Sequence, residues 1–351
     1  MKPLLPTFLT YFIFYFALSI GCKDKENNPN PNGLIVYTSS ADHRYGEIYS
    51  CLADGSKNER ISNLSDKTLT DAEYWPELSE DGNLVKWHNA VYNVEICDLN
   101  SKNITAVDKA WSSCWIDNGK RIAYIQFGLD NSIYVYDISE KVKSQLTEYD
   151  YLHRPIGDSI FSFRGLQWWS TEKKIISTTI YNDVNHLVTI DPISGRIVEM
   201  YAMEIPEKYS LKGNLLTWIN SDSIFIYDLK SKIKSAFSVA NDNSPANPVL
   251  SPDLKRIAYT VVREYEYNFK KYLCTDIITC NWKGFDRREV TVHSDIPDSY
   301  KYKAVLSPFW VSNNELLFSA GNIYLIKDNP QTVVQIIGKA LKAGGQIQGK
   351  F

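Results

Sequence analysis

The sequence has few of the residues from which metal centres and nucleic-acid-binding surfaces are built. Its 351 residues include only 5 His, and its 38 Lys and Arg side chains are outnumbered by 41 Asp and Glu side chains. A protein that binds nucleic acid needs a basic surplus, so a formal net charge of −3 argues against such a partner. The histidines lie far apart and no cysteine pair has the spacing of a zinc site. The sequence therefore predicts neither a metal centre nor a cofactor.

Motifs of common enzyme classes are also missing. Walker, dinucleotide-binding and Gly-x-Ser-x-Gly sequences do not occur. Residues 157–160 (Gly-Asp-Ser-Ile) are similar to the nucleophile block of SGNH hydrolases, but the chain has no C-terminal Asp-x-x-His to complete such a site. No segment combines helical periodicity with capping residues, and residues 335–343 are the one helix candidate. These absences leave the chain without an assigned reaction.

Aromatic residues, by contrast, are abundant. The chain has 23 Tyr, 14 Phe and 9 Trp, which favour β-strands over helices. The one long apolar run is N-terminal, where residues 4–20 follow Lys2 and are almost wholly apolar. This run is shorter than the ~20 residues of a membrane-spanning helix and fits the apolar part of a secretory signal.

The apolar run ends at a cysteine. Residues 18–22 (Leu-Ser-Ile-Gly-Cys) resemble the lipobox of bacterial lipoproteins, in which the cysteine becomes the lipid-bearing N-terminus. The resemblance predicts a lipoprotein signal peptide over residues 1–21 and lipid on Cys22; a plain signal peptide or anchor is the alternative. Residues 22–32 are polar and contain proline, which predicts a disordered tether. Because Lys23 rather than Asp follows the cysteine, the resemblance implies the outer membrane, on its periplasmic or cell-surface side.

A strand pattern recurs seven times after the tether, at intervals of about 46 residues. Each copy is a β-rich run, as in residues 133–137 (Ile-Tyr-Val-Tyr-Asp) and 224–228 (Ile-Phe-Ile-Tyr-Asp). Most copies are followed at once by turn formers, such as Asn100-Ser101 and Ser194-Gly195. A second pattern, an apolar or Trp residue followed by a polar turn and another strand, precedes most copies. A unit of ~40–50 residues with four short strands is typical of a propeller blade.

Two stretches carry a family resemblance. Residues 250–259 (Leu-Ser-Pro-Asp-Leu-Lys-Arg-Ile-Ala-Tyr) and 119–124 (Gly-Lys-Arg-Ile-Ala-Tyr) resemble the TolB-like, WD-related repeat. The resemblance extends over roughly residues 33–338. It implies a single all-β domain over residues 33–351, a β-propeller of seven blades, each a four-stranded antiparallel sheet, with six blades as the alternative. The first unit lacks its innermost strand, so closure of the ring requires a strand from residues 341–351.

The cysteines that follow Cys22 are predicted to serve packing. Cys51, Cys97 and Cys280 occupy the repeat column that elsewhere holds apolar or aromatic residues, and free cysteine behaves as a small buried hydrophobe. A disulfide between Cys97 and Cys114 is the open alternative.

Propeller topology also predicts which face binds. With strands named A to D from the innermost outward, the A–B and C–D turns lie on one face and the B–C and D–A connections on the other. The A–B and C–D turns are short, whereas the other connections are long and aromatic: 39–47, 66–75, 148–163, 263–272 and 294–303. Loops on a rigid scaffold often carry binding residues, although these could also be ordinary surface loops. The predicted ligand-binding residues are His43, Arg44, Tyr45, Tyr151, His153, Arg154, Tyr265, Tyr267, Tyr300 and Tyr302.

These observations predict a lipid-anchored propeller of the cell envelope that acts as a non-catalytic binding or scaffolding module. The TolB-like resemblance implies docking of envelope partners, so we expect a protein or glycan partner. A glycan-active enzyme, a polysaccharide lyase or hydrolase with its site at the central channel, is the alternative, and a structural lipoprotein within a larger complex is a third. Converging histidines or paired carboxylates at the channel would favour the enzyme, and a channel lined only by apolar and hydroxyl residues would favour binding.

Overall fold

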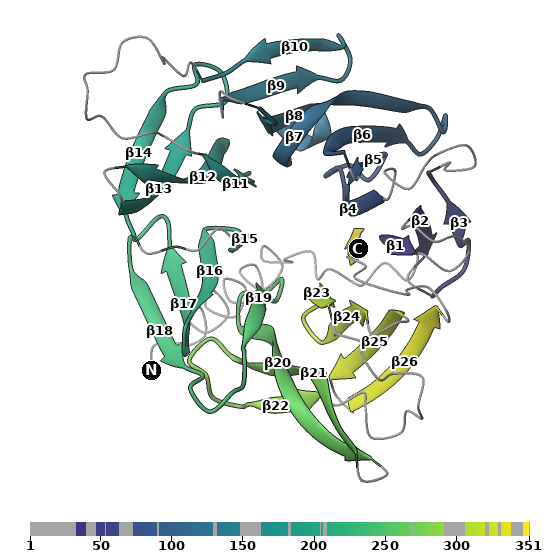
Figure 1. The fold of residues 1–351 in the computed structure, drawn as a ribbon, viewed down its shortest axis with the longest axis vertical. Coiled ribbons are helices and arrows are strands. Elements are labelled where there is room, and N and C mark those ends of the chain that lie inside the picture. The colour runs from purple at the N-terminus through teal and green to yellow at the C-terminus, as the bar shows by residue number, and fades with distance from the viewer. Residues whose placement is uncertain are drawn as a thin grey trace, which may run out of the picture.

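The computed structural model is a ring of antiparallel β-sheets, viewed along its axis in Figure 1. It describes residues 33–39, 47–52, 54–62, 73–89, 91–128, 132–147, 163–181, 184–203, 205, 209–267, 270–290, 306–319, 323–328, 331–337 and 347–350. In these ranges the regular elements are strands and a 3-10 turn, η2 (Asp117–Gly119). No helix within them is long and apolar enough to cross a membrane.

Five sheets have four strands each. One combines the two ends of the described chain, in the order β27 (Ile347–Lys350), β1 (Leu34–Ser39), β2 (Glu47–Leu52), β3 (Glu59–Arg60). Two more are β11 (Arg164–Trp169), β12 (Lys174–Tyr181), β13 (Val184–Ile190), β14 (Ile197–Ala202) and β15 (Ser210–Lys212), β16 (Leu215–Asn220), β17 (Ser223–Asp228), β18 (Lys234–Ser238). The last two are β19 (Ala246–Leu250), β20 (Arg256–Tyr267), β21 (Lys270–Asn281), β22 (Arg288–Val290) and β23 (Leu306–Ser312), β24 (Glu315–Ser319), β25 (Ile323–Asp328), β26 (Gln331–Ile337).

Strand β7 (Ile104–Ile116) joins two further sets of four strands into one seven-stranded sheet. The other members are β4 (Glu73–Leu78), β5 (Leu84–Asn89), β6 (Asn93–Asp98), β8 (Arg121–Gln126), β9 (Ile133–Asp137) and β10 (Val142–Gln145). The first half of β7 pairs with β6 and its second half with β8, and the register is irregular between Ala110 and Ser112. Strand β7 therefore serves as the outer strand of one set and the inner strand of the next.

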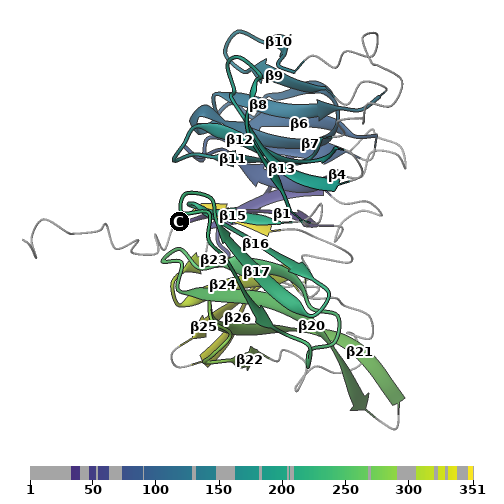
Figure 2. The same cartoon turned by 90° about the vertical axis from the view of Figure 1, so that its left-hand side faces the viewer.

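The ring is closed by a strand from the C-terminal end of the chain. Strand β27 pairs antiparallel with β1, with Leu34 opposite Lys350 and Tyr37 opposite Ile347. Figure 1 shows the C-terminus near the centre of the ring. The predicted closing strand from the last eleven residues is therefore confirmed. In the side view of Figure 2 the C-terminus lies on the left, whereas the hairpin of β20 and β21 extends to the right.

The turns after the third strands explain one column of the sequence repeat. An aspartate stands at or directly after the end of four such strands, and its carboxylate accepts main-chain N–H groups two and three residues further on: Asp98, Asp137, Asp191 and Asp228. These N–H donors hold the pKa of the Asp98, Asp137 and Asp191 carboxyls below its usual value. Such Asx turns reverse the chain within a few residues, so the connections on this face of the ring are short.

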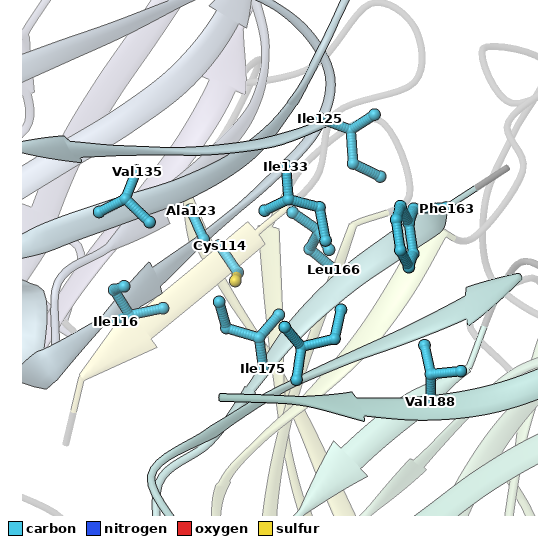
Figure 3. Close-up of a cluster of buried hydrophobic side chains, with 11 residues drawn as sticks. Cys114, Ile116, Ala123, Ile125, Ile133, Val135, Phe163, Leu166, Ile175 and Val188 are labelled. Atoms are coloured by element: carbon cyan, nitrogen blue, oxygen red, sulfur yellow. The ribbon is translucent and has the colours of Figure 1, made fainter. Parts of the chain in front are cut away.

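The core lies between successive sheets. Figure 3 shows one cluster, in which Ile116, Ile125 and Ile133 of the seven-stranded sheet pack against Ile175 and Val188 of the next sheet. All five side chains are fully buried. Each sheet thus covers the apolar face of its neighbour, as the alternation of strand side chains requires.

Three expectations from the sequence are wrong. The helix candidate at 335–343 begins inside strand β26, which ends at Ile337, and its remaining residues lie outside the described ranges. The segment 263–272 is not a loop, because β20 and β21 stay paired as far as Tyr267 and Lys270. The B–C connections are not uniformly long, since β5–β6, β12–β13 and β16–β17 are joined by short turns.

Candidate functional site

The structure tests little of the predicted ligand-binding set. Tyr265 lies on β20, and its hydroxyl donates a hydrogen bond to the buried carboxylate of Asp276 on β21. Tyr267 lies on the same strand, and its side chain is outside the described part. The remaining candidates fall outside the described residues: Cys22, His43, Arg44, Tyr45, Tyr151, His153, Arg154, Tyr300 and Tyr302. The binding role of this set stays a prediction.

A cluster of three aromatic side chains that the sequence did not single out lies on the same face. Ring centroids are 4.9 Å apart for Tyr92 and Trp111, 4.9 Å for Tyr92 and Phe127, and 4.3 Å for Trp111 and Phe127. Trp111 is 51% exposed and Phe127 is 37% exposed. Tyr92 lies in the β5–β6 turn, Trp111 on β7 and Phe127 directly after β8. We call these three residues the aromatic surface.

Main-chain hydrogen bonds hold the aromatic surface in place. The Tyr92 N–H donates to the Asn89 carbonyl (2.9 Å), and the Tyr92 carbonyl accepts from the Ala110 N–H (2.8 Å). The Phe127 N–H donates to the Lys109 carbonyl (2.9 Å). These bonds tie the β5–β6 turn, strand β7 and the end of β8 together, so the aromatic surface is ordered before any partner binds.

A fourth exposed aromatic residue, Trp75, occupies a strained backbone position. It lies at a register irregularity of inner strand β4 with φ of 57°, and its ring is 45% exposed. The irregularities of inner strands β11 and β19 hold Gly165 (φ 58°) and Asn247 (φ 52°), which tolerate this region far better. The ring meets the His88 ring edge-on at 5.7 Å. A bulky residue held at positive φ points to a role other than folding.

His88 is a described histidine that lies next to a hydroxyl group, that of Ser113, as in a base and its nucleophile. It is buried, and its Nε2 lies 2.9 Å from the Ser113 hydroxyl. Burial, together with the nearby charge of Lys86, lowers the pKa of His88 to about 3. A histidine with this pKa is a poor general base near neutral pH, so the Ser113–His88 pair is not arranged as a nucleophile and its base.

A cavity of about 570 Å³ opens among the inner strands, near the A–B turns. This volume falls within the range of small-ligand pockets. Aromatic and aliphatic side chains line it together with polar ones, and three of the lining residues are charged. The lining includes Glu77, Glu80, Trp115, Trp168, Lys212 and Trp310.

The tryptophans of this cavity also join the sheets. The Trp115 indole N–H donates to the Glu77 carbonyl (3.1 Å), and the Trp310 indole N–H donates to the Val249 carbonyl (3.2 Å). Each bond runs from one set of strands to the preceding set. The indole nitrogen of Trp168 is buried and has no acceptor within the described chain. The repeat column of Trp and Leu predicted from sequence therefore forms both the channel wall and the contacts between sheets.

The charges at the cavity are unequally paired. The ammonium of Lys86, which is 2% exposed, contacts the Glu77 carboxylate and the Ser113 carbonyl. Glu80 is exposed on the β4–β5 turn. Lys212 reaches water within the recess, and the surrounding protein lowers the pKa of its amine. The channel thus contains two carboxylates, of which one is already bound to a buried lysine.

The described cysteines form no disulfide, and the described residues form no metal site. Cys51, Cys97, Cys114 and Cys280 are free and buried, which confirms their packing role and excludes a Cys97–Cys114 disulfide in this structure. Burial raises the pKa of the Cys51 and Cys280 thiols to about 12 and that of Cys97 to about 11. Searched over the ranges that the structure describes, His, Cys, Asp and Glu form no group of three or more that could hold a metal ion.

Comparison with known proteins identifies the architecture. No family model matches the sequence, and no curated protein matches it. The Cps50 (Swd1) β-propeller domain of Myceliophteria thermophila matches the structure with a TM-score of 0.55 at 11% identity, over 83% of this chain and 93% of that domain. The fold is that of a β-propeller.

Two other solved structures share this propeller fold. A chain of the mitotic checkpoint complex has a TM-score of 0.51 at 15% identity, covering 78% of this chain and 80% of its own length. Oligogalacturonate lyase in complex with manganese has a TM-score of 0.56 at 10% identity, covering 86% and 83%. Identities this low establish the fold alone, and propellers serve many functions.

Proposed function

We propose that this chain is a non-catalytic binding module of the cell envelope whose protein partner docks on the aromatic surface. The observation that carries the proposal is the packing of half-buried Tyr92 against the exposed rings of Trp111 and Phe127 on a hydrogen-bonded scaffold. Trp and Tyr are the residues most enriched at binding hot spots, and a surface that is already ordered loses little entropy on binding. Strained, exposed Trp75 on neighbouring β4 supports the same use of this face.

A protein partner is preferred because the three rings form one contiguous apolar patch. Rings packed against one another suit an apolar side-chain cluster of a partner, which would exclude water from all three at once. The likeness to a chain of the mitotic checkpoint complex supports this use of the fold in protein assemblies. A glycan could stack on the same rings, and the experiment below separates the two occupants.

The proposal includes a lipid anchor on Cys22 and an outer-membrane location. Strand β1 begins at Leu34, opposite Lys350 of β27, and this end of the sheet is the end at which the A–B and C–D turns lie. The tether preceding β1 would leave the ring from that face. The aromatic surface lies at the other end of the strands and would point away from the membrane. We also infer seven blades, counting β7 once with β4–β6 and once with β8–β10.

Photo-crosslinking in native membranes tests the docking surface. A photoreactive phenylalanine analogue replaces Trp111 in the full chain, and the same analogue replaces Phe285, on the opposite face, as the control. We expect one protein adduct at position 111 and none at position 285. Adducts at both positions, or no protein adduct at position 111, would overturn the proposal. Retention of the chain on immobilised envelope glycan without an adduct would assign the surface to a glycan.

Substitution then tests the energetics with the captured partner. We expect the combined variant Tyr92→Ser, Trp111→Ser, Phe127→Ser to weaken binding at least about 100-fold, since hot-spot residues each contribute about 2 kcal/mol or more. The control variant Ile193→Ser, Ile233→Ser, Phe285→Ser removes three more exposed apolar residues on the opposite face and should bind the partner as the original chain does. Equal affinities of all three proteins would contradict the assignment.

A glycan-active enzyme with its site at the channel is the second candidate. The observation in its favour is the cavity that Glu77 and Glu80 line together. Because Glu77 is engaged by Lys86, Glu80 would have to carry the acid–base chemistry. Turnover of envelope glycans that is lost in Glu80→Gln would establish this activity.

A further inference from the structure

Three turns on the face opposite the aromatic surface project apolar side chains into water. Ile193, Phe285 and Ile233 are 83%, 68% and 65% exposed, the highest values among large hydrophobic residues in the described chain. They lie in the turns β13–β14, β21–β22 and β17–β18, each of which joins the third and fourth strands of a sheet. These sheets follow one another around the ring (Figure 1). We call the three residues the apolar rim.

The turns do not need these apolar residues for their own folding. Asp191, Asp228 and Asn281 close the turns by accepting main-chain N–H groups, including that of Ile193 at 3.0 Å and that of Phe285 at 3.0 Å. Turns of this kind ordinarily carry polar residues. A side chain such as Ile193 therefore gains nothing by pointing into water, and its exposure in three successive sheets favours a contact with something outside the chain.

A cationic side chain accompanies each apolar one. Arg196, Lys230 and Lys283 lie in the same three turns and are exposed or partly exposed. The Asp191 carboxylate accepts the N–H groups of Ile193 and Ser194, and the Asp228 carboxylate accepts those two and three residues further on. Apolar side chains beside lysine and arginine are typical of surfaces that rest on lipid, since the apolar group enters the headgroup region and the cation stays at its level.

The position of the rim matches the exit of the chain. Because the sheets are antiparallel, the turns after their third strands lie at the end where β1 begins, at Leu34. The thirty-three residues before Leu34 contain the predicted lipid attachment at Cys22. A bilayer that holds the lipid would thus lie on the side to which the rim points.

We propose that the apolar rim is a second membrane contact, which lays this face of the ring on the lipid headgroup surface. The proposal rests on the anchoring part of the proposed function and adds an orientation to it. Contacts of a few side chains bind a bilayer weakly on their own, but the tether makes them intramolecular and raises their effective concentration. The contact would keep the aromatic surface directed away from the membrane.

The test uses the full lipidated chain in vesicles of phosphatidylethanolamine and phosphatidylglycerol. A cysteine introduced by Ser194→Cys, next to Ile193, carries an environment-sensitive fluorophore. Lys109→Cys, beside the aromatic surface, provides the control position. Labelling of the chain without an added cysteine sets the background, and Cys51, Cys97, Cys114 and Cys280 are buried. Lipids with a quencher at headgroup depth report contact, and vesicle flotation reports anchoring separately.

We expect quenching at position 194 and none at position 109. The variant Ile193→Ser, Ile233→Ser, Phe285→Ser should still float with the vesicles but lose the quenching at position 194. A chain that floats without quenching at position 194, or with equal quenching at both positions, would overturn the rim contact and leave the anchor standing. A chain that neither floats nor shows quenching would overturn both.

Discussion

Trp111 and Trp115 lie four residues apart on strand β7 and have opposite surroundings. Trp111 is 51% exposed and contacts Tyr92 and Phe127, whereas Trp115 is 5% exposed and donates its indole N–H to the Glu77 carbonyl. Trp111 lies at the end of the strands that carries the B–C and D–A connections, which we call the connection end. Trp115 lies at the end that carries the A–B turns and the cavity, which we call the channel end. Tryptophan therefore forms part of an exposed surface at position 111 and a hydrogen bond between neighbouring sets of strands at position 115.

The difference shows how the ring separates stability from recognition. At the channel end, hydrogen bonds and an ion pair fix Trp115, Glu77 and Lys86, so a change to any one leaves a buried polar group without its partner. At the connection end, the rings of the aromatic surface are fixed through their main chain and their side chains remain free for a partner. Substitutions should therefore affect folding at one end and binding at the other.

The largest effect is expected from Glu77→Gln. Neutralising this carboxylate leaves the ammonium of Lys86 buried without its counter-charge, which should lower the free energy of unfolding by about 3 kcal/mol. Chemical denaturation at neutral pH measures this loss. Glu80→Gln changes an exposed carboxylate of the same wall and should alter stability by less than about 0.5 kcal/mol. Equal effects of the two substitutions would show that the buried pairing of Glu77 with Lys86 does not stabilise this end of the ring.

Acid should destabilise the folded chain through protonation of buried His88. Its pKa falls from 6.5 to about 3 on folding, so between these values the unfolded chain binds a proton that the folded chain does not. Stability is therefore complete above pH 6.5 and is lost as the pH falls, by about 2 kcal/mol between pH 7 and pH 5. In His88→Gln, the free energy of unfolding should change less with pH across this range. An unchanged slope in that variant would show that another group is responsible.

The smallest effects on stability are expected from substitution of the two tryptophans of β7, Trp115 and Trp111. Trp115→Phe leaves the Glu77 carbonyl without its donor and should cost about 1–2 kcal/mol of unfolding free energy, whereas Trp111→Phe should stay within about 0.5 kcal/mol. Trp168→Phe is the matched control, because it removes an indole N–H that has no acceptor in the described chain and should be nearly neutral. Thermal unfolding of the three variants measures the differences, and a larger loss in Trp111→Phe than in Trp115→Phe would reverse the assignment.

Much of the fold followed from local patterns in the sequence. Turn formers such as Asn100-Ser101 and Ser194-Gly195 predicted turns after the third strands. In the structure, the Asp98 and Asp191 carboxylates close these turns by accepting N–H groups two and three residues further on. The missing inner strand of the first unit predicted β27, since a ring without it would leave β1 as an open edge. The polar residues of segment 263–272 favour a loop, whereas in the structure β20 and β21 stay paired across it as far as Tyr267 and Lys270.

The aromatic surface could not be read from the chain. Tyr92, Trp111 and Phe127 come from a turn, a strand and a strand end, and each is a single aromatic residue without a local pattern. The one available signal was an aromatic residue inside a short connection, as with Tyr92, where turn formers are expected. Strand β7 brings the three together, because it pairs with β6 in its first half and with β8 in its second, with Trp111 at the register irregularity between them.

The sequence by itself determined the strands, the tight turns and the closing strand, because periodicity, Asx turns and the need to cover an edge act over a few residues. Only the tertiary structure decided which aromatic side chains are structural and which are exposed. The indole of Trp115 donates to a carbonyl of the preceding strands, that of Trp168 has no acceptor among the described residues, and Trp111 is half exposed to water. That outcome depends on how neighbouring sheets pack around the ring, and no single repeat contains this information.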